Sequence, residues 1–187
     1  MYMKPLTPTT PHVIIMVGIP GAGKSQFAEH FAKAFDAPFV NTKKLHSFGL
    51  DDEATLNVTD YFFAELLKTK RTLLFEGPTH NRNYRHELFK KVRDAGYKPL
   101  LVWVQTETAE AKRRSTRRGG AYTVDGFADM LGRFHAPALA EKPIVISGKH
   151  TFASQVKIVL KHLATETRPT DPKQPERPRS ARNIFIR

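Results

Sequence analysis

The sequence predicts an α/β fold in which helices cover both faces of a five-stranded parallel sheet. The first observation is that strand and helix patterns alternate from residue 12 to about residue 164, as in chains of βαβ units. The second is a phosphate-binding loop, GIPGAGKS at residues 18–25, set between an apolar run and a helical pattern. The third is size, because 187 residues, 40% of them hydrophobic, suffice to bury one core. We therefore expect a three-layer P-loop NTPase domain.

The first third of the chain predicts two strands around one helix. The apolar run at residues 13–17 predicts the first strand. A helix over residues 23–35 is predicted because phenylalanines recur at four-residue spacing on one face (Phe27, Phe31 and Phe35). Ala37-Pro38 ends that helix, and residues 38–41 form a short second strand.

The middle of the chain predicts a loop over residues 47–58, followed by a helix over residues 60–70 that Thr59 caps. Residues 72–76 are predicted to form the third strand. Asn83 is expected to cap the next helix, which ends at Gly96. The remaining elements, in chain order, are a strand over 100–104, helices over 108–118 and 124–134, a strand over 144–146, and a last helix capped by Thr151.

The phosphate-binding loop carries the residue types that its chemistry requires. Its glycines let backbone N–H groups surround the β-phosphate, Lys24 bridges the β- and γ-phosphates, and the Ser25 hydroxyl coordinates Mg²⁺. The helix that follows adds its positive N-terminal end. We expect ATP and Mg²⁺ to bind here, with contacts from Gly18, Pro20, Gly21, Ala22, Gly23, Lys24, Ser25 and Gln26.

Composition limits the classes of function. The formal net charge of +12 indicates an anionic partner larger than one nucleotide, for which nucleic acid is the natural candidate. The alternative is that a phosphate-handling site itself collects Lys and Arg. The absence of cysteine excludes disulfides, thiolate zinc sites and cysteine nucleophiles. Since neither a signal peptide nor an apolar run of 18 residues is evident, we expect a cytoplasmic protein without a membrane partner.

The domain organisation follows from shifts in composition. Residues 1–11 are expected to be an N-terminal extension, and residues 12–164 the P-loop domain. Residues 165–187 are rich in Pro, Arg and Lys and poor in apolar residues, which predicts a basic, flexible tail.

Three further stretches accompany the loop: Glu76-Gly77-Pro78-Thr79 at the end of the third predicted strand, Arg85 in the next helix, and the segment from Gly96-Tyr97 through Arg113 and Arg117. Over residues 12–164 the chain resembles the small P-loop kinases of the polynucleotide kinase and zeta-toxin type, above all the 5′-kinase domain of phage polynucleotide kinase. The resemblance implies an adenylate-kinase-like topology with a short arginine-bearing lid. It also implies transfer of the γ-phosphoryl group of ATP to a hydroxyl, a nucleic-acid 5′ end being one candidate.

The resemblance implies roles for individual side chains. Arg113 and Arg117 would neutralise the migrating phosphoryl group, and their spacing places both on one helical face. A solvated basic helix end is the alternative. Glu76 would hold Mg²⁺ or order its bound water, and Thr79 and Arg85 would contact substrate.

One departure concerns the general base. After the second strand this family places an Asp that activates the acceptor hydroxyl, and an Arg three residues later; here these positions hold Lys43 and His46. Lys43 suits contact with a substrate phosphate, because its pKa is too high for a base without strong desolvation. Glu76, His46 and the pair Asp51 and Asp52 are the alternative bases, and the sequence does not choose among them.

Three functions therefore stay open. The first is an ATP-dependent phosphotransferase, which the lid arginines favour. The second is a nucleotide-dependent nucleic-acid-binding or regulatory module with degenerate catalysis, which Lys43 favours. The third is a small-molecule or nucleotide-sugar kinase, which fits the fold and explains the charge less well.

Overall fold

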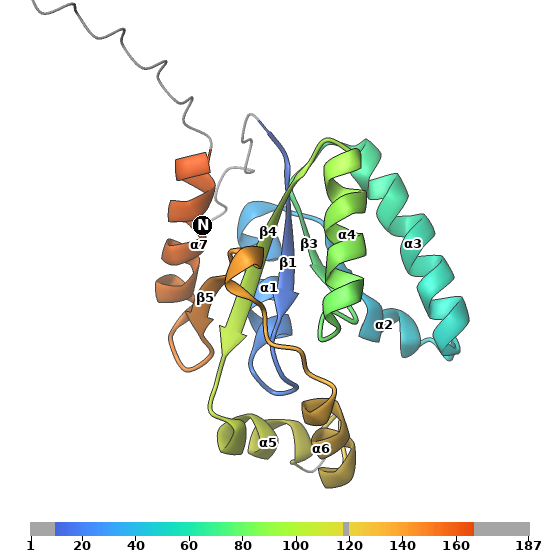
Figure 1. Ribbon diagram of the computed structural model, residues 1–187, viewed down its shortest axis with the longest axis vertical. Coiled ribbons are helices and arrows are strands. Elements are labelled where there is room, and N and C mark those ends of the chain that lie inside the picture. The colour runs from blue at the N-terminus through green and yellow to red at the C-terminus, as the bar shows by residue number, and fades with distance from the viewer. Residues whose placement is uncertain (1–9, 118–119, 167–187) are drawn as a thin grey trace, which may run out of the picture.

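The computed structural model describes residues 10–117 and 120–166. Five parallel strands form one sheet in the order β2-β3-β1-β4-β5, flanked by helices (Figure 1). In chain order the elements are β1 (His12–Val17), α1 (Lys24–Phe35), β2 (Phe39–Asn41), α2 (Thr42–His46), α3 (Asp52–Lys68), β3 (Leu73–Glu76), α4 (Arg82–Asp94), β4 (Lys98–Gln105), α5 (Thr108–Thr116), α6 (Val124–Gly132), the 3₁₀ helix η1 (Leu139–Glu141), β5 (Ile144–Ser147) and α7 (Phe152–Glu166). The predicted fold class, an α/β domain with five parallel strands, is confirmed.

The core has two halves because alternate residues of a strand face opposite sides of the sheet. Ile14 and Met16 of β1 pack with side chains of α1 and α7 on one face. Val13, Ile15 and Val17 pack with α3 and α4 on the other. Strand β1 lies between β3 and β4, so all six of its residues are buried.

This topology gathers functional residues at one edge of the sheet. Since all strands run in the same direction, their carboxyl ends meet at the edge that faces α5 and α6 in Figure 1. The P-loop follows β1 there, and Glu76 is the last residue of β3. Open α/β sheets bind ligands outside the carboxyl ends of their strands, so the candidate site lies at this edge.

The segment after β2 corrects the sequence prediction, because much of the expected loop over residues 47–58 is helical. Helix α3 begins at Asp52, and the Asp51 carboxylate caps it by accepting from the Ala54 N–H at 2.7 Å. Thr59, the predicted cap, is buried inside α3, and its hydroxyl donates to the Thr55 carbonyl at 2.7 Å. The buried face of α3 begins with two threonines, Thr55 and Thr59, rather than apolar residues. The first half of the helix therefore lacks the apolar periodicity that predicts a helix.

Two helix ends also differ from the prediction. Asn81 rather than Asn83 caps α4, since its side-chain oxygen accepts from the N–H groups of Asn83 and Tyr84. Helix α5 ends at Thr116, before the predicted boundary at 118. Gly96 follows α4 with a φ of +77°, which confirms it as the stop.

The expected tail lies outside the described residues except for its first two positions, 165 and 166, which belong to α7. Of the expected N-terminal extension, only residues 10 and 11 are described. In the part of the chain that the structure covers, no helix is both long and apolar enough to cross a membrane.

Candidate functional site

The P-loop connects β1 to α1 in a conformation that requires glycine at two positions. Gly21 and Gly23 have φ angles of +78° and +105°, in the left-handed region. A Cβ at Gly21 would lie 2.1 Å from the carbonyl oxygen of Ala111 in α5, so no larger residue fits. Helix α1 starts without a side-chain cap, which leaves its first backbone N–H groups open to an anion.

Lys24 lies at the centre of the site. Its ammonium donates to the carbonyl oxygens of Gly18 at 2.9 Å and Ile19 at 3.0 Å. Burial lowers the pKa of Lys24 to about 8; the Glu76 carboxylate offsets part of this shift, and the Lys43 ammonium adds to it. Two neutral carbonyl groups therefore do not fully compensate the buried positive charge of Lys24. An anion would, and the phosphates of a nucleotide are such a partner.

Ser25 and Glu76 form the oxygen pair expected of a magnesium site. The Ser25 hydroxyl donates to Glu76 Oε1 at 3.0 Å. Glu76 is 2% exposed, and its other oxygen, Oε2, is buried without a hydrogen-bond partner among the described residues. The Ser25 hydroxyl and the Glu76 carboxylate are thus adjacent oxygen ligands, and Glu76 Oε2 has no hydrogen bond to lose. This pair fits Mg²⁺, which takes one or two protein ligands and completes its coordination shell with phosphates and water. The described residues hold no cluster of three or more His, Cys, Asp or Glu suited to a metal.

A hollow of about 830 Å³ brings most of the predicted nucleotide site together. The P-loop, the lid helix α5 and the turn between β5 and α7 surround it. Its lining residues are Gly21, Gly23, Lys24, Ser25, Gln26, Lys43, Glu76, Glu110, Arg113, Arg114, Arg117, Gly148, Lys149 and His150. We call it the nucleotide hollow.

The lid arginines differ in how they are held. The Glu110 carboxylate accepts from Arg113 at two positions, each at 2.9 Å, and from Arg114 Nε at 2.8 Å. These hydrogen bonds lower the pKa of Glu110 to about 2. The Arg113 side chain is 76% exposed, and Arg117 is exposed just after the end of α5. Both can therefore reorient towards a bound phosphate.

The turn after β5 is a part of the site that the sequence analysis missed. A Cβ at Gly148 would lie 2.0 Å from the carbonyl oxygen of Ala22, so this turn packs directly on the P-loop. The Thr106 hydroxyl donates to the same carbonyl at 3.0 Å, and Arg114 Nη1 donates to the Gly148 carbonyl at 3.1 Å. A glycine two residues after the strand predicted over 144–146 was the available signal, since it marks close backbone approach.

A second hollow, of about 40 Å³, lies beside Gly18 and Pro20 of the P-loop, and we call it the acceptor hollow. Lys24, Lys43 and Glu76 line it as well as the nucleotide hollow. Its other lining residues are Gly77, Thr79, His80, Tyr122, Met130 and Phe134. The Lys43 ammonium lies 4.8 Å from the centre of the Tyr122 ring, a cation–π contact. The two hollows therefore share three charged residues.

Thr79 and Arg85, predicted to contact substrate, lie deeper than expected. The Thr79 hydroxyl donates to the Met16 carbonyl at 2.6 Å, and Thr79 is 2% exposed. The Arg85 side chain is fully buried and pairs with Glu141 at 2.7 Å; it also donates to the carbonyl oxygens of Thr79 and His135. Arg85 thus contacts protein groups and is absent from the lining of the acceptor hollow.

The alternative bases are placed differently. Asp51 caps α3 and is absent from the lining of both hollows, as is Asp52, whereas Glu76 lines both. His46 is the last residue of α2, and its side chain lies outside the described part of the structure.

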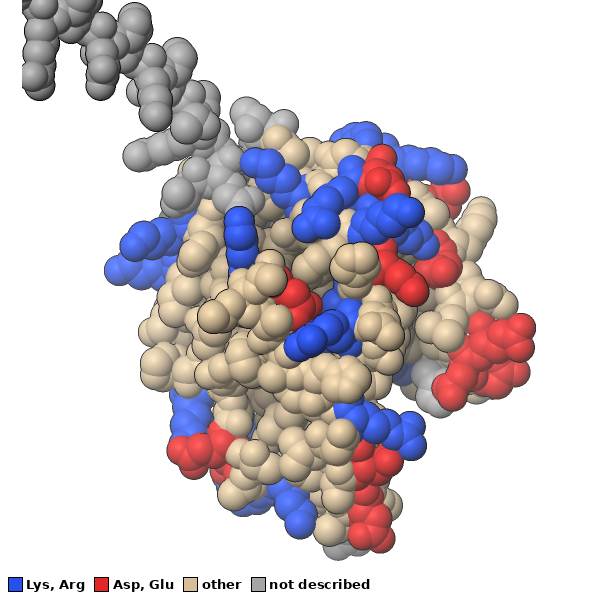
Figure 2. Space-filling view, viewed as in Figure 1, with Lys and Arg blue, Asp and Glu red and all other residues tan. Residues whose placement is uncertain are grey.

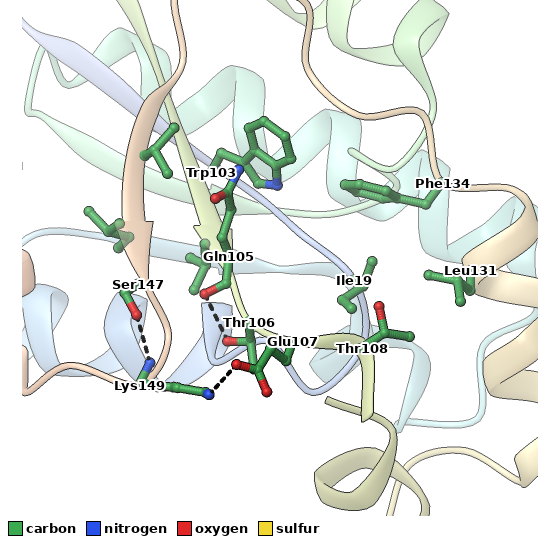
Figure 3. A pocket seen from close by; sticks show the side chains of 13 residues that line it. Ile19, Trp103, Gln105, Thr106, Glu107, Thr108, Leu131, Phe134, Ser147 and Lys149 are labelled. Atoms are coloured by element: carbon green, nitrogen blue, oxygen red, sulfur yellow. Dashed lines mark hydrogen bonds and ion pairs between the residues drawn. The ribbon is translucent and has the colours of Figure 1, made fainter. Parts of the chain in front are cut away.

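Ile19, Thr106 and Glu107 are among the residues that line a third hollow, of about 590 Å³ (Figure 3). Trp103, Leu131, Phe134 and Val145 give it an apolar lining. At its rim, Lys149 pairs with Glu107 at 2.7 Å. Lys24, Ser25 and Glu76 do not line it, so the phosphate-binding groups belong to the two hollows described above.

Replacing Lys24 with alanine is expected to weaken ATP binding by about 1 to 3 kcal/mol, the range for hydrogen bonds to charged groups. Calorimetric titration measures the difference, and Lys33→Ala, an exposed lysine on the same helix, should leave Kd unchanged. Because Lys24 loses its proton above about pH 8, wild-type binding at pH 9 should take up a proton that Lys24→Ala does not. Equal affinities of the wild-type and Lys24→Ala proteins would contradict the assignment.

Comparison with known proteins places this fold in a class, the P-loop kinase fold. The fold resembles that of a gluconokinase from Sinorhizobium meliloti 1021, with a TM-score of 0.65 and 20% identity over 84% of this chain and 94% of that chain. A sugar kinase from Janibacter sp. HTCC2649 matches with a TM-score of 0.62 and 20% identity, over 83% of this chain and 95% of that chain. A protein from Chloroflexus aurantiacus j-10-fl gives a TM-score of 0.66 at 16% identity, over 83% of this chain and 97% of that chain.

The sequence places the chain in a family. A family model described as "AAA domain" (AAA_33) matches residues 13–137, so the chain belongs to that family. A search of curated proteins finds no match. The expected kinase-like P-loop domain is thereby confirmed, whereas the finer likeness to phage polynucleotide kinase stays a prediction.

Proposed function

We propose that the protein is an ATP-dependent kinase that transfers the γ-phosphoryl group to a hydroxyl of a small polar molecule. The observation that carries this proposal is that Lys24, Lys43 and Glu76 line both the nucleotide hollow and the acceptor hollow. A nucleotide bound along the P-loop would therefore end with its γ-phosphate at the junction, next to the acceptor. Two adjoining sites that share phosphate-binding groups are what in-line transfer requires.

The chain's own residues supply most of the charge for transfer. Lys24 would leave its two carbonyl partners and bind the terminal phosphates, while Arg113 and Arg117 approach from the lid. Ser25 and Glu76 would hold Mg²⁺, which neutralises charge on the phosphate oxygens when bound. Because the Gly21 backbone touches Ala111, the lid and the P-loop meet at a fixed position.

The acceptor hollow favours a small acceptor. Its volume is about 40 Å³, and Tyr122, Met130 and Phe134 line one side of it, so the segment from Tyr122 to Phe134 must move for a substrate to enter. The Lys43 ammonium at its border favours an acceptor with a carboxylate or phosphate. The gluconokinase and the sugar kinase among the similar structures support the same class of acceptor.

A nucleic-acid acceptor has less support. On the face shown in Figure 2, Lys and Arg side chains lie among Asp and Glu side chains and do not form one continuous basic patch. Part of the net charge of +12 comes from residues 167–187, which contain six basic and two acidic residues outside the described structure. The charge therefore does not by itself indicate a nucleic-acid interface on the domain.

The second candidate is an ATP-binding module with degenerate catalysis. Lys43, at the position where the resembling kinases carry an aspartate, is the observation that favours it. Such a module would bind ATP through the same P-loop but transfer nothing.

Incubation with γ-labelled ATP and a panel of acceptors tests both candidates. We expect label to reach one class of small hydroxyl compounds, with sugar acids, sugar phosphates, nucleosides and nucleotide sugars compared side by side. Lys24→Ala is the control that should abolish transfer. Transfer confined to 5′-hydroxyl oligonucleotides would contradict the small acceptor, and ATP binding without any transfer would favour the degenerate module.

A further inference from the structure

Two of the described residues that line the acceptor hollow belong to types that serve as general bases. Lys24 and Lys43 are cationic and Tyr122 is a phenol, which leaves Glu76 and His80. Glu76 already accepts from Ser25 and is placed to hold Mg²⁺, so its carboxylate is engaged on the nucleotide side. His80 is left as the other lining residue of the acceptor hollow that can act as a base.

We propose that His80 is the general base that accepts the proton of the acceptor hydroxyl. This inference rests on the proposed kinase function. His80 lies in the loop between β3 and α4, half-buried, and lines the acceptor hollow with Lys24 and Glu76. It is four residues beyond Glu76, in a different loop from the position after β2 where the resembling kinases carry an aspartate.

The backbone at His80 is held from two sides. Its carbonyl oxygen accepts from the His135 N–H at 2.9 Å, in the chain between α6 and β5. The buried Arg85 guanidinium donates to the carbonyl oxygen of Thr79 at 2.8 Å and pairs with Glu141. These hydrogen bonds hold the backbone at Thr79 and His80 in place, and a general base needs such a fixed position. Arg85 is thus a positioning residue for His80.

The surroundings keep the imidazole neutral. Burial lowers the pKa of His80 below its usual value of 6.5, and Arg133, His135, Lys24 and Arg85 lower it further. Lys43 and Glu76 are the other charged groups around the hollow. His80 is therefore unprotonated at neutral pH, and after it has accepted a proton the neighbouring cations favour release of that proton to solvent.

Transfer of the phosphoryl group makes one bond to phosphorus and breaks another. The acceptor oxygen forms a bond to the γ-phosphorus while the bond from that phosphorus to the β,γ-bridging oxygen of ATP breaks, and ADP leaves. The hydroxyl proton passes to an imidazole nitrogen of His80, which later gives it to water. The products are the phosphorylated acceptor, ADP and one proton.

The test compares His80→Gln with His86→Gln, an exposed histidine on the neighbouring helix α4. With the acceptor found by the panel, His80→Gln is expected to lower the single-turnover transfer rate by about 100-fold or more, within the range for general bases. Its Kd for ATP should stay within about two-fold of wild type, which also shows that the site is folded. His86→Gln should leave both quantities unchanged.

The pH profile separates a base from a structural residue. The wild-type rate should fall with decreasing pH below a pKa under 6.5, and His80→Gln should lack this acidic limb. An NMR titration, assigned by the signal lost in His80→Gln, should show the same pKa. Unchanged rate and profile in His80→Gln, with an active wild type, would overturn this inference alone; a wild type that transfers to no acceptor would overturn the kinase proposal and this inference with it.

Discussion

Replacing Arg85 with methionine is expected to lower the free energy of unfolding by about 3–5 kcal/mol, the usual cost of removing one partner of a buried ion pair. The guanidinium is fully buried, and its loss leaves Glu141 without its partner and two carbonyl groups without their donor. Urea denaturation measures the change. Lys90→Met, an exposed position on the same helix, should change stability by less than about 0.5 kcal/mol.

The same ion pair predicts a pH dependence of stability. Burial raises the pKa of Glu141, but hydrogen bonds from Arg85 and the Ala138 N–H outweigh it, so the pKa lies below 4.5. A lowered carboxyl pKa stabilises the folded state above the unfolded pKa, and this contribution is lost as pH falls through the folded pKa. As the pH falls from 5 towards acid denaturation, the free energy of unfolding should therefore decrease less in Glu141→Gln than in wild type. Parallel losses in the two proteins would contradict this role.

Replacing Arg117 or Arg113 with alanine is expected to lower the rate of phosphoryl transfer by at least about 100-fold while changing the Kd for ATP only a few-fold. An arginine that meets the migrating phosphoryl group stabilises charge that develops in the transition state. Among the described residues, Arg113 pairs with Glu110 on its own helix, and both arginines line the nucleotide hollow. Single-turnover transfer and calorimetric titration separate the two effects.

Lys112→Ala is the matched control for the lid, since Lys112 is an exposed cation of α5 that does not line the nucleotide hollow. It should leave the rate unchanged. If Arg113→Ala and Arg117→Ala also leave it unchanged, both arginines belong to a solvated helix end rather than to the catalytic lid.

The strands and the P-loop could be predicted because their signals are local. A continuous apolar run marks β1, and the motif at residues 18–25 places glycines, Lys24 and Ser25 where backbone geometry and phosphate require them. The expectation for Glu76 came from the family resemblance, as a carboxylate at the end of the third predicted strand, and in the structure its carboxylate accepts from Ser25. Helix α3 was partly hidden because Thr55 and Thr59 occupy buried positions that apolar residues normally mark.

Contacts between distant segments could not be predicted. Arg85 read as a substrate contact, yet it is satisfied by Glu141, 56 residues further along the chain, in a 3₁₀ helix with no sequence signal. The spacing of His80 in the sequence does not distinguish it either. Its neighbours come from two distant segments, the P-loop and the chain between α6 and β5. Tertiary packing, rather than local pattern, sets these surroundings.

The contact between Gly21 and Ala111 also determines how the lid can open. Because a Cβ at Gly21 would lie 2.1 Å from the Ala111 carbonyl, the first turn of α5 already rests on the P-loop backbone and cannot approach further. We therefore expect α5 to move by rotation about Ala111, with the smallest displacement there and the largest near Arg117, just after the end of the helix. A rotation of this kind would open the acceptor hollow at Tyr122 and Met130 while the phosphate-binding loop keeps its shape. Because Arg113 and Arg117 line the nucleotide hollow, the same rotation would open that hollow too, so we expect entry of the acceptor and exchange of the nucleotide to be coupled.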